Sequence, residues 1–381
     1  MSNVQKTIQS LLDETGSGIV INGPNPWDPQ VRDDEFYSRL LSGGSIGLGE
    51  AYMDGLWTCQ ALDQLFERVV RHNVQEAVKS FPQIALKAGV FALGAKFINR
   101  QTIERARYVG KMHYDERMLH ESTYDQRLTG SCAYWVDAAD VDEAQERKLD
   151  LVCRKIELKP GQTVLDIGCG WGAFMGFAAE HYGARCIGVT ISQDQVAYAT
   201  ERYRPYVDSG HLEFRFQDYR EFKGTVDHVV SMGMFEHVGS DNYRDYFAAA
   251  RRAMRGRHSR FMHHTITGRK RSKTIDPWLD KYIFPRGELP TIGQIMTAVE
   301  GLFVVEDVQN IGPHYDLTLM AWNDNFQSRR EEVVAKYGER VARMWEYYLL
   351  QCAGGFRSNG IGVAQTVLSP DGVDGGYISA R

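Results

Sequence analysis

Two patterns of hydrophobic and polar positions follow one another along the chain. Up to about residue 110 the apolar residues recur at helical spacing, as in 61–66 and 73–81, which predicts a helix-rich region. From residue 162 onward, short apolar runs alternate with helical patterns, which predicts an α/β unit with a mostly parallel seven-stranded sheet. The expected strands are Thr163–Gly168, Arg185–Ser192, Leu212–Gln217, Asp227–Met232, Phe261–Ile266, Phe303–Val308 and Leu317–Trp322.

The length and the change of pattern predict two domains. A chain of 381 residues is long enough for two domains of roughly 100–200 residues each. We expect a smaller helix-rich domain at 1–98, a linker at 99–127 and a sheet-forming domain at 128–381. The linker is rich in basic residues, namely Arg100, Arg105, Arg107, Lys111, His113 and Arg117.

Composition narrows the class of protein. The net charge of -5 does not favour binding to nucleic acid or, by bulk attraction, to an anionic membrane. The N-terminus lacks an export pattern, and no apolar run reaches the ~18–20 residues of a membrane span. The six cysteines form no CxxC pair, which favours reduced thiols, and the histidines show no metal-ligand spacing. We therefore expect a cytoplasmic protein without a bound metal.

A glycine-rich turn marks a candidate ligand site. The run 164–172 reads VLDIGCGWG and leads from a buried strand into a helix at Ala173–Tyr182. Glycines there let the backbone approach a ligand at the carboxyl end of the first strand. A GxGxG loop alone is shared by many nucleotide binders, and a turn without a ligand stays the alternative. Asp166 narrows the choice, because its carboxylate can meet an amino or hydroxyl group rather than a pyrophosphate.

Two further motifs follow at the ends of the next strands, GVTIS at 188–192 and QDYR at 217–220. Together with the glycine-rich turn they resemble a class I S-adenosylmethionine methyltransferase domain, which has a Rossmann-like fold. The resemblance implies that Gly168, Gly170 and Trp171 line the methionine and ribose region, and that Asp218 and Tyr219 frame the adenine. It implies ribose contacts from Thr190, Ser192 and Gln195, and the expected cofactor-binding set is completed by Ser131 and Asp166.

Four more motifs narrow the resemblance. They are SCAYW at 131–135, GMFEHVG at 233–239, HTI at 264–266 and YDLTLMAW at 315–322. With the run 44–57, they make the chain similar to the cyclopropane fatty acid synthase family over nearly its whole length. The resemblance implies methylene transfer from S-adenosylmethionine to a cis double bond of a phospholipid acyl chain. It also implies a homodimer, an N-terminal domain that assists lipid binding, and a bicarbonate ion held by Cys132, Glu236, His264, Tyr315 and the backbone of Ile266.

The chemistry explains these residue types. An isolated alkene is a poor nucleophile, so the sulfonium must be held against it in near-attack geometry. Methylation leaves a carbocation, which aromatic faces can stabilise while water is excluded. Glu236 would form a relay with bicarbonate, because a carboxylate that accepts the ion's proton makes the ion more basic. The expected aromatic lining is Tyr134, Trp135, Phe235, Trp278, Tyr282 and Tyr315.

Each of these residues also has a structural interpretation. Cys132 could be a small buried filler, His264 a hydrogen-bonded strand residue and Tyr315 an ordinary packing residue. We interpret His237 and His263, which adjoin motif positions, as structural.

The segment Phe81–Arg100 is a candidate membrane-contacting element. Its apolar run is too short to span a bilayer, while Lys87, Lys96 and Arg100 could meet phosphate groups. A buried helix packing the N-terminal domain is the alternative. The first interpretation predicts peripheral association with the inner face of the cell membrane.

The chain departs from the family pattern at several places. Glu116–Ser122 replaces a Gly-Asn-Asp-aromatic pattern, Gly130 stands where Tyr is common, Arg255–Arg260 replaces a Lys-Pro-Gly-type turn, and Ala364 stands at a common aromatic position. These changes keep two alternatives open: a lipid methyltransferase that does not close the ring, and a catalytically weakened lipid-binding protein.

Overall fold

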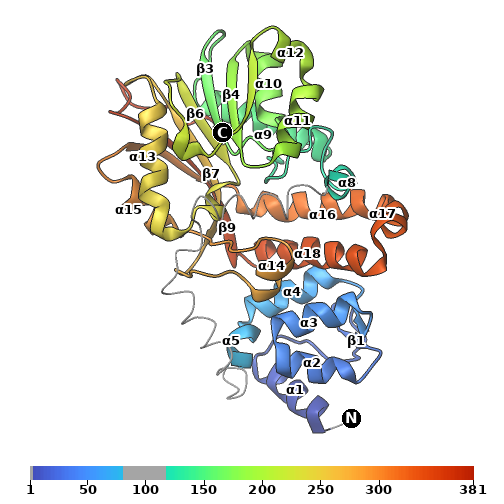
Figure 1. Ribbon diagram of the computed structural model, residues 1–381. Coiled ribbons are helices and arrows are strands. Elements are labelled where there is room, and N and C mark those ends of the chain that lie inside the picture. The colour runs from blue at the N-terminus through green and yellow to red at the C-terminus, as the bar shows by residue number, and fades with distance from the viewer. Residues whose placement is uncertain (1–2, 80–116) are drawn as a thin grey trace. The chain divides into compact units, whose positions relative to one another are not determined.

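The computed structural model describes residues 3–79 and 117–381, which form two compact units (Figure 1). We call them the helical unit and the sheet unit. The helical unit takes its described residues from Met1–Ile98, Thr274–Pro285 and Tyr315–Ile361. The sheet unit takes them from Asn99–Lys273, Arg286–His314 and Gly362–Arg381. Both units combine segments distant in sequence, whereas the expected boundaries at 98 and 127 cut the chain into continuous pieces. As functional domains, 1–98, 99–127 and 128–381 remain a prediction.

Seven strands form one sheet within the described part of the sheet unit, in the order β5-β4-β3-β6-β7-β9-β8. The pairs β3–β4, β3–β6, β4–β5 and β6–β7 are parallel, and β8 runs antiparallel to β9. The predicted α/β class with a mostly parallel seven-stranded sheet is therefore confirmed. The strands are β3 Thr163–Ile167, β4 Arg185–Thr190, β5 Leu212–Phe216, β6 His228–Met232, β7 Phe261–Gly268, β8 Val304–Asn310 and β9 Ile361–Ser369.

One expected strand is wrong. Leu317–Trp322 lies inside helix α16, Gly312–Ser328, and the seventh strand is β9. Leu319 and Trp322 are buried while Leu317 is 49% exposed, which is the i, i+3 burial of a helix rather than the alternation of a strand. A short apolar run fits either element, so its sequence alone did not decide between them.

Helices cover both faces of the sheet, as Figure 1 shows for the sheet unit. Successive residues of β3 point to opposite faces. Leu165 and Ile167 pack in a core with helices α13 and α15, whereas Val164 packs in a second core with α9 and α10. The helices of this unit are α8 Arg117–Glu121, α9 Val141–Lys155, α10 Ala173–Tyr182, α11 Gln193–Arg202, α12 Arg204–Asp208, α13 Tyr243–Ala253 and α15 Ile292–Val299.

Strand β3 lies between β4 and β6: the chain first adds β4 and β5 on one side of β3 and then β6 and β7 on the other. In open parallel sheets, such a switch point leaves a crevice above the strand ends. The short 3₁₀ turns η1 Tyr219–Glu221, η2 Phe235–His237 and η3 Ser240–Asn242 follow β5 and β6. These turns and the glycine-rich turn after β3 position the candidate site.

The helical unit is held by close helix packing. A Cβ on Gly354 of α18 would lie 2.5 Å from the Asp63 oxygen and the Glu67 nitrogen of the α4 backbone, so only glycine allows this approach. Arg357 forms ion pairs with Asp63 and Asp316 in the same region. The elements are α1 Asn3–Glu14, β1 Gln30–Val31, α2 Glu35–Gly43, α3 Ser45–Met53, β2 Trp57–Thr58, α4 Leu62–Arg71, α5 Val74–Lys79, α14 Pro277–Tyr282, α17 Arg330–Tyr337 and α18 Glu339–Arg357.

Two expected segments, the membrane-contacting element and the basic linker, fall wholly or largely in the gap between the described ranges. Phe81–Arg100 and most of the basic linker residues lie outside the described residues. Among the helices of residues 3–79 and 117–381, none is long and apolar enough to cross a membrane.

Candidate functional site

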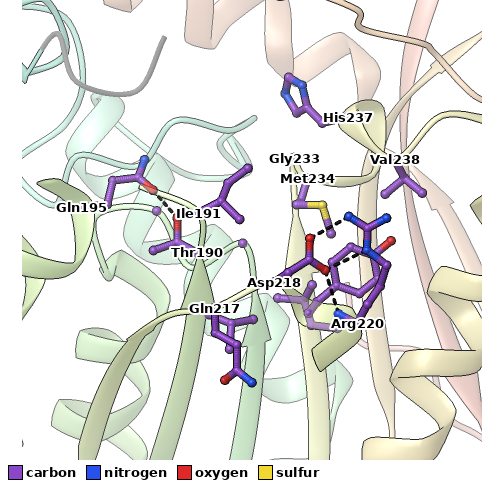
Figure 2. A pocket seen from close by; sticks show the side chains of 15 residues that line it. Thr190, Ile191, Gln195, Gln217, Asp218, Arg220, Gly233, Met234, His237 and Val238 are labelled. Carbon is purple, nitrogen blue, oxygen red and sulfur yellow. Dashed lines mark hydrogen bonds and ion pairs between the residues drawn. The ribbon is translucent and has the colours of Figure 1, made fainter. Parts of the chain in front are cut away.

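A pocket opens above the carboxyl ends of β3, β4, β5 and β6 in the sheet unit (Figure 2). Its empty volume is about 860 Å³, the adjoining open solvent included. The lining residues are Ile167, Gly168, Gly170, Val189, Thr190, Ile191, Gln195, Gln217, Asp218, Tyr219, Arg220, Gly233, Met234, His237 and Val238.

The glycine-rich turn forms the floor of this pocket. Gly168 and Gly170 have φ angles of 83° and 53°, in the left-handed region that favours glycine. A Cβ on Gly168 would lie 2.7 Å from Cγ of Met234, another lining residue. Because Gly168 has no side chain, the turn after β3 can pack closely against Met234 in the turn after β6.

The end of β4 presents an ordered amide. The Thr190 hydroxyl donates a 2.7 Å hydrogen bond to Oε1 of Gln195, and the Ser192 hydroxyl caps α11 by accepting from the Gln195 main-chain nitrogen at 3.3 Å. Thr190 and Gln195 line the pocket, whereas Ser192 is not a lining residue and serves as the N-cap of α11. Because Oε1 already accepts, the amide nitrogen of Gln195 is the group left to donate to a ligand.

A carboxylate and a guanidinium form a bidentate ion pair after β5. Nε and Nη2 of Arg220 donate to the two carboxylate oxygens of Asp218 at 2.8 and 2.7 Å, as Figure 2 shows. Both residues line the pocket, together with Tyr219. Arg220 belonged to a quoted motif but not to the predicted site, although its i+2 spacing from Asp218 was a usable signal.

Four predicted cofactor residues lie outside the pocket lining, namely Ser192, described above, and Asp166, Trp171 and Ser131. Asp166 is 2% exposed, and burial raises the pKa of its carboxyl to about 7 while the Lys148 ammonium opposes the rise. The Trp171 ring packs against His120 and Tyr198. The Ser131 hydroxyl accepts a 2.8 Å hydrogen bond from Lys148 Nζ.

Sequence reasoning missed several lining residues, and it missed Lys148. His237, which had been interpreted as structural, is one of the added lining positions. The others are Ile167, Val189, Ile191, Gln217, Arg220, Gly233, Met234 and Val238. Lys148 is fully buried on α9. Nothing in the charged pattern around it distinguishes a buried lysine from an exposed one.

Glu236 is a buried acid beside the pocket. It lies in turn η2, whose neighbours Met234, His237 and Val238 line the pocket. Its Oε1 accepts a 2.6 Å hydrogen bond from the main-chain nitrogen of Ile266. Its Oε2 is buried and has no hydrogen-bond partner among the residues that the structure describes. Burial raises the pKa of this carboxyl to about 7, so it can exchange a proton near neutrality.

His264 lies on the neighbouring strand. Met232 of β6 pairs with His264 of β7, and His264 is 1% exposed. Gln365 Nε2 lies 3.3 Å from its Nδ1, and burial holds the pKa of the imidazole well below its usual value. A neutral ring that accepts at Nδ1 carries its proton on Nε2, where it can donate.

The other expected anion ligands occupy different settings. Cys132 is fully buried, and its Sγ lies 3.7 Å from the Ile311 carbonyl oxygen. Tyr315 belongs to the helical unit, where its ring packs on Phe356 and Trp322 at 4.5 and 5.9 Å between centroids. The structure thus brings Glu236 of η2 together with Ile266 of β7, two residues after His264 on the same strand.

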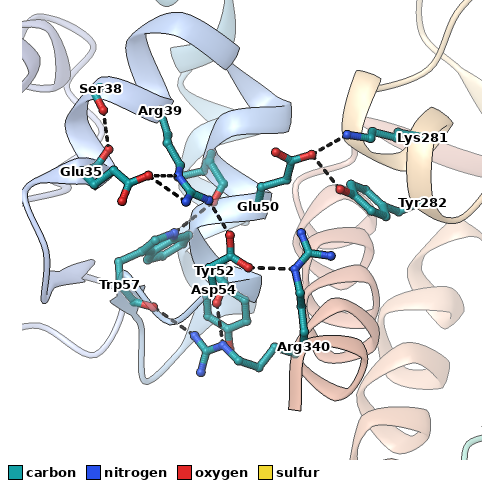
Figure 3. A network of polar contacts seen from close by, with 12 residues as sticks. Glu35, Ser38, Arg39, Glu50, Tyr52, Asp54, Trp57, Lys281, Tyr282 and Arg340 are labelled. Atoms are coloured by element: carbon teal, nitrogen blue, oxygen red, sulfur yellow. Dashed lines mark hydrogen bonds and ion pairs between the residues drawn. The ribbon is translucent and has the colours of Figure 1, made fainter. Parts of the chain in front are cut away.

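The expected aromatic lining is divided between the units. Phe235 is fully buried and stacks on Tyr243 in the sheet-unit core, and Trp278 is fully buried in the helical unit. The Tyr282 hydroxyl donates to Oε1 of Glu50 at 2.6 Å within an ion-pair network of the helical unit (Figure 3). Tyr134, in the sheet unit, packs against His314 at 5.1 Å.

His263 is enclosed by aromatic rings. The imidazole is fully buried between Phe235, Tyr246, Phe247 and Phe261, with ring centroids 4.7–5.9 Å away. Burial lowers the pKa of His263 to about 3, so the ring is neutral. This setting fits its structural interpretation.

The unusual sequence positions have local explanations. A Cβ on Gly130 would lie 3.3 Å from the Tyr124 ring, so an aromatic ring of another residue fills the space beside this position. The positive charges of Arg255, Arg257 and Arg260 are paired with Asp227, Asp374 and Glu157. Ala364 is 2% exposed in the sheet.

Comparison with known proteins assigns the family. Residues 101–366 match the family model described as mycolic acid cyclopropane synthetase. The chain belongs to the mycolic acid cyclopropane synthetase family. The resemblance predicted from the motifs is thereby confirmed.

Relatives of this family extend over the chain. The cyclopropane-fatty-acyl-phospholipid synthase of Escherichia coli strain K12 is 43% identical over 366 residues, covering 96% of this chain and 93% of the relative. The structure of the cyclopropane synthase MmaA2 from Mycobacterium tuberculosis superposes with a TM-score of 0.65 at 32% identity, over 69% of this chain and 98% of that one. The mycolic acid cyclopropane synthase CmaA1, complexed with SAH and CTAB, gives 0.64 at 31% identity over the same shares.

These comparisons fix the class of fold and chemistry. The sheet unit has the class I methyltransferase fold, and the protein is an enzyme of a methyltransferase family. Within residues 3–79 and 117–381, no group of three or more His, Cys, Asp or Glu side chains is arranged to hold a metal ion.

Proposed function

We propose that the protein transfers a methylene group from S-adenosylmethionine to the cis double bond of unsaturated acyl chains in membrane phospholipids, forming a cyclopropane ring and S-adenosylhomocysteine. The observation that carries the proposal is Glu236. A buried acid, whose Oε2 has no hydrogen-bond partner among the described residues, lies in the same turn as three residues that line the pocket above the strand ends. The E. coli relative, whose name states this activity, covers nearly the whole chain.

The pocket residues divide the recognition of S-adenosylmethionine between them. The backbone of Gly168 and Gly170 would contact the methionine and ribose, and the Gln195 amide would donate to a ribose hydroxyl. Asp218 and Tyr219 would frame the adenine, with Arg220 fixing the Asp218 carboxylate. Asp166, Trp171, Ser131 and Ser192 would act from behind the lining, since each is buried there.

The reaction balances in two steps. The sulfur–methyl bond breaks with its electron pair remaining on sulfur, while the alkene π pair forms the new carbon–carbon bond. The other alkene carbon is then cationic and must be kept from water. Loss of a proton from the transferred methyl leaves the C–H electron pair to close the three-membered ring, which requires a base near neutrality.

The residues present fit bicarbonate as that base. When bound, bicarbonate supplies the oxygen that removes the methyl proton. Oε2 of Glu236 is the buried acceptor that would hold the ion's own hydroxyl proton, while Ile266 fixes the other carboxylate oxygen. The neutral His264 would donate from Nε2. The family resemblance adds Cys132 and Tyr315 to the proposed set.

We further propose that the enzyme works as a homodimer at the inner face of the cell membrane, from the cytoplasm. The chemistry supports the location, because the substrate double bond lies inside a bilayer. The helical unit would assist lipid binding.

The test is the fate of the double bond. Purified protein is incubated with S-adenosylmethionine labelled with ¹³C in the methyl group and with cis-unsaturated phospholipid vesicles, with and without added bicarbonate. Upfield ¹³C-labelled cyclopropane methylene signals that increase with bicarbonate support the proposal. A labelled methyl branch identifies a lipid methyltransferase that does not close the ring. Unchanged olefin signals despite cofactor and vesicle binding identify a lipid-binding protein.

A further inference from the structure

Two buried side chains of α9 hold residue 131. Gln145 Nε2 donates to the Ser131 carbonyl oxygen at 2.8 Å, and Lys148 Nζ donates to the Ser131 hydroxyl at 2.8 Å. Both side chains are fully buried, and their i, i+3 spacing puts them on one face of the helix. Side chains of one helix thus donate hydrogen bonds to both oxygens of Ser131.

The loop held by these hydrogen bonds reaches the edge of the pocket. A Cβ on the lining residue Gly233 would lie 3.9 Å from Cβ of Ser131 and 4.0 Å from the Gly130 carbonyl oxygen, so the loop lies directly against Gly233. Lys148 Nζ also lies 3.8 Å from Sδ of Met232, the residue before Gly233. Lys148 therefore contacts both the loop and the end of β6.

A buried ammonium at this place is costly for folding. An ammonium group loses its hydration on burial, and an apolar side chain of similar size would fill the volume without that cost. Burial lowers the pKa of Lys148 to about 8, while Asp125, Cys132 and Asp166 favour its charged form. The groups that face it include His264 of the proposed anion site. Such a costly charge is typical of a functional region.

We propose that Lys148 and Gln145 are positioning residues, which fix the 130–131 loop against β6 and so set the edge of the cofactor pocket. The inference rests on the proposed function, because it takes the pocket to bind S-adenosylmethionine and its product. Both residues act mainly through residue 131, since the Gln145 amide contacts the Thr129 carbonyl oxygen at the longer distance of 3.3 Å and Lys148 contacts the Met232 sulfur at 3.8 Å. Without them the loop would lose its register with Gly233, and cofactor affinity would fall although the sheet stays folded.

The chain offers a matched control on the same helix. Lys155 is also fully buried on α9, but its Nζ faces Asp307 of β8 at 3.5 Å. K155M removes an equally buried charge without touching residue 131. S-adenosylhomocysteine binding is measured by titration calorimetry for the wild type, K148M, Q145L and K155M, with circular dichroism to establish folding.

We expect K148M and Q145L each to weaken S-adenosylhomocysteine binding about 10-fold, the change for the loss of one buried hydrogen bond to a charged or amide group. K155M should bind within about 2-fold of the wild type. A double-mutant cycle with S131A tests the route: K148M should add less than about 2-fold to S131A, because the hydroxyl through which it acts is then absent.

The outcomes separate the two proposals. Wild type that does not bind S-adenosylhomocysteine overturns the proposed function and this inference with it. Wild type that binds, with K148M and Q145L at wild-type affinity, overturns the inference alone. An equal loss in K155M, or a fully multiplicative S131A cycle, shows a general effect of burial and also overturns it. If K148M fails to fold, Q145L decides by the same criterion, since it removes no charge.

Discussion

The main-chain nitrogen of Ile266 donates a 2.6 Å hydrogen bond to Oε1 of Glu236, joining the end of β7 to the turn that follows β6. The bond fixes one carboxylate oxygen and leaves Oε2 buried without a hydrogen-bond partner in the described part of the chain. An acid held this way has a fixed direction for proton acceptance.

Activity should rise with pH through the titration of Glu236. Its carboxyl must be ionised to accept a proton, and burial raises its pKa to about 7. The rate at saturating S-adenosylmethionine should therefore increase roughly 10-fold per pH unit below 7 and level off above about 8. A rate profile from pH 5.5 to 9 that is flat below 7 would show that the ionised Glu236 is not required.

The same pKa predicts a linked change in stability. The carboxyl has a raised pKa in the folded protein, so its favourable contribution is fully present below about 4.5 and is lost as pH rises through 7. Wild type should lose on the order of 3 kcal/mol relative to E236Q between pH 4.5 and 8. Urea unfolding of both proteins across this range measures the difference. Parallel pH profiles for the two proteins would contradict a raised pKa at Glu236.

Alanine substitutions at two glycines with positive φ should separate the effect of backbone strain from the effect of a clash inside the pocket. G168A places a Cβ 2.7 Å from Cγ of Met234, and we expect S-adenosylhomocysteine affinity to fall at least 10-fold. Gly161 is the matched control, because it has a similar φ of 80° but open space around a Cβ. G161A should cost only about 1 kcal/mol of stability and leave binding unchanged. Equal binding losses in the two variants, measured by calorimetry, would contradict this account of Gly168.

The Thr190 hydroxyl should matter for binding through Gln195. T190V removes the donor at 2.7 Å from Gln195 Oε1, which frees the amide to rotate away from a ligand. We expect about 5-fold weaker S-adenosylhomocysteine binding, near the loss of one hydrogen bond. Thr163, the first residue of β3, makes a similar bond to Asp227 and serves as the control. T163V should lower stability but not affinity. A larger loss of binding in T163V than in T190V would argue against a pocket role for Gln195.

Two adjacent glycines of α18 should respond oppositely to alanine. A Cβ on Gly354 meets the α4 backbone at 2.5 Å, whereas a Cβ on Gly355 meets Ile361 at an ordinary 3.5 Å. G354A should destabilise the protein by about 1–3 kcal/mol through overpacking. G355A should be neutral or stabilising by up to about 1 kcal/mol, since alanine favours the helix. Thermal and urea unfolding check this, and a G354A protein as stable as the wild type would contradict the packing of α4 against α18.

Local patterns predicted the parts of the fold that depend on local chain geometry. Strands β3 to β8 follow apolar runs, and the glycine-rich turn needs the positive φ angles that only glycine adopts freely. Strand β9 was not predicted, because Gln365 and Thr366 are polar yet fully buried and interrupt the apolar pattern. Leu317–Trp322 was wrongly predicted as a strand, because its apolar residues belong to a helix.

The site could be predicted only where one motif carries both position and chemistry. Gly168, Gly170, Thr190, Gln195, Asp218 and Tyr219 were expected at the cofactor pocket and line the pocket. Lys148 and Met234 depend on tertiary contacts that no local spacing encodes, whereas the i+2 spacing of Arg220 from Asp218 is local. The roles of Glu236, His264, Tyr315, Cys132 and Ile266 stay predictions that rest on the family resemblance and on the geometry around Glu236.

The most direct test of the central proposal is the lipid product formed by E236Q beside the wild type. With ¹³C-methyl S-adenosylmethionine and cis-unsaturated phospholipid vesicles, wild type should produce labelled cyclopropane methylene signals. E236Q should form them at least about 100-fold more slowly, as expected when a proton-transfer group is lost, while binding S-adenosylhomocysteine as tightly. Ring formation by E236Q at the wild-type rate, or unchanged olefin with wild type that binds both cofactor and vesicles, would contradict the proposal.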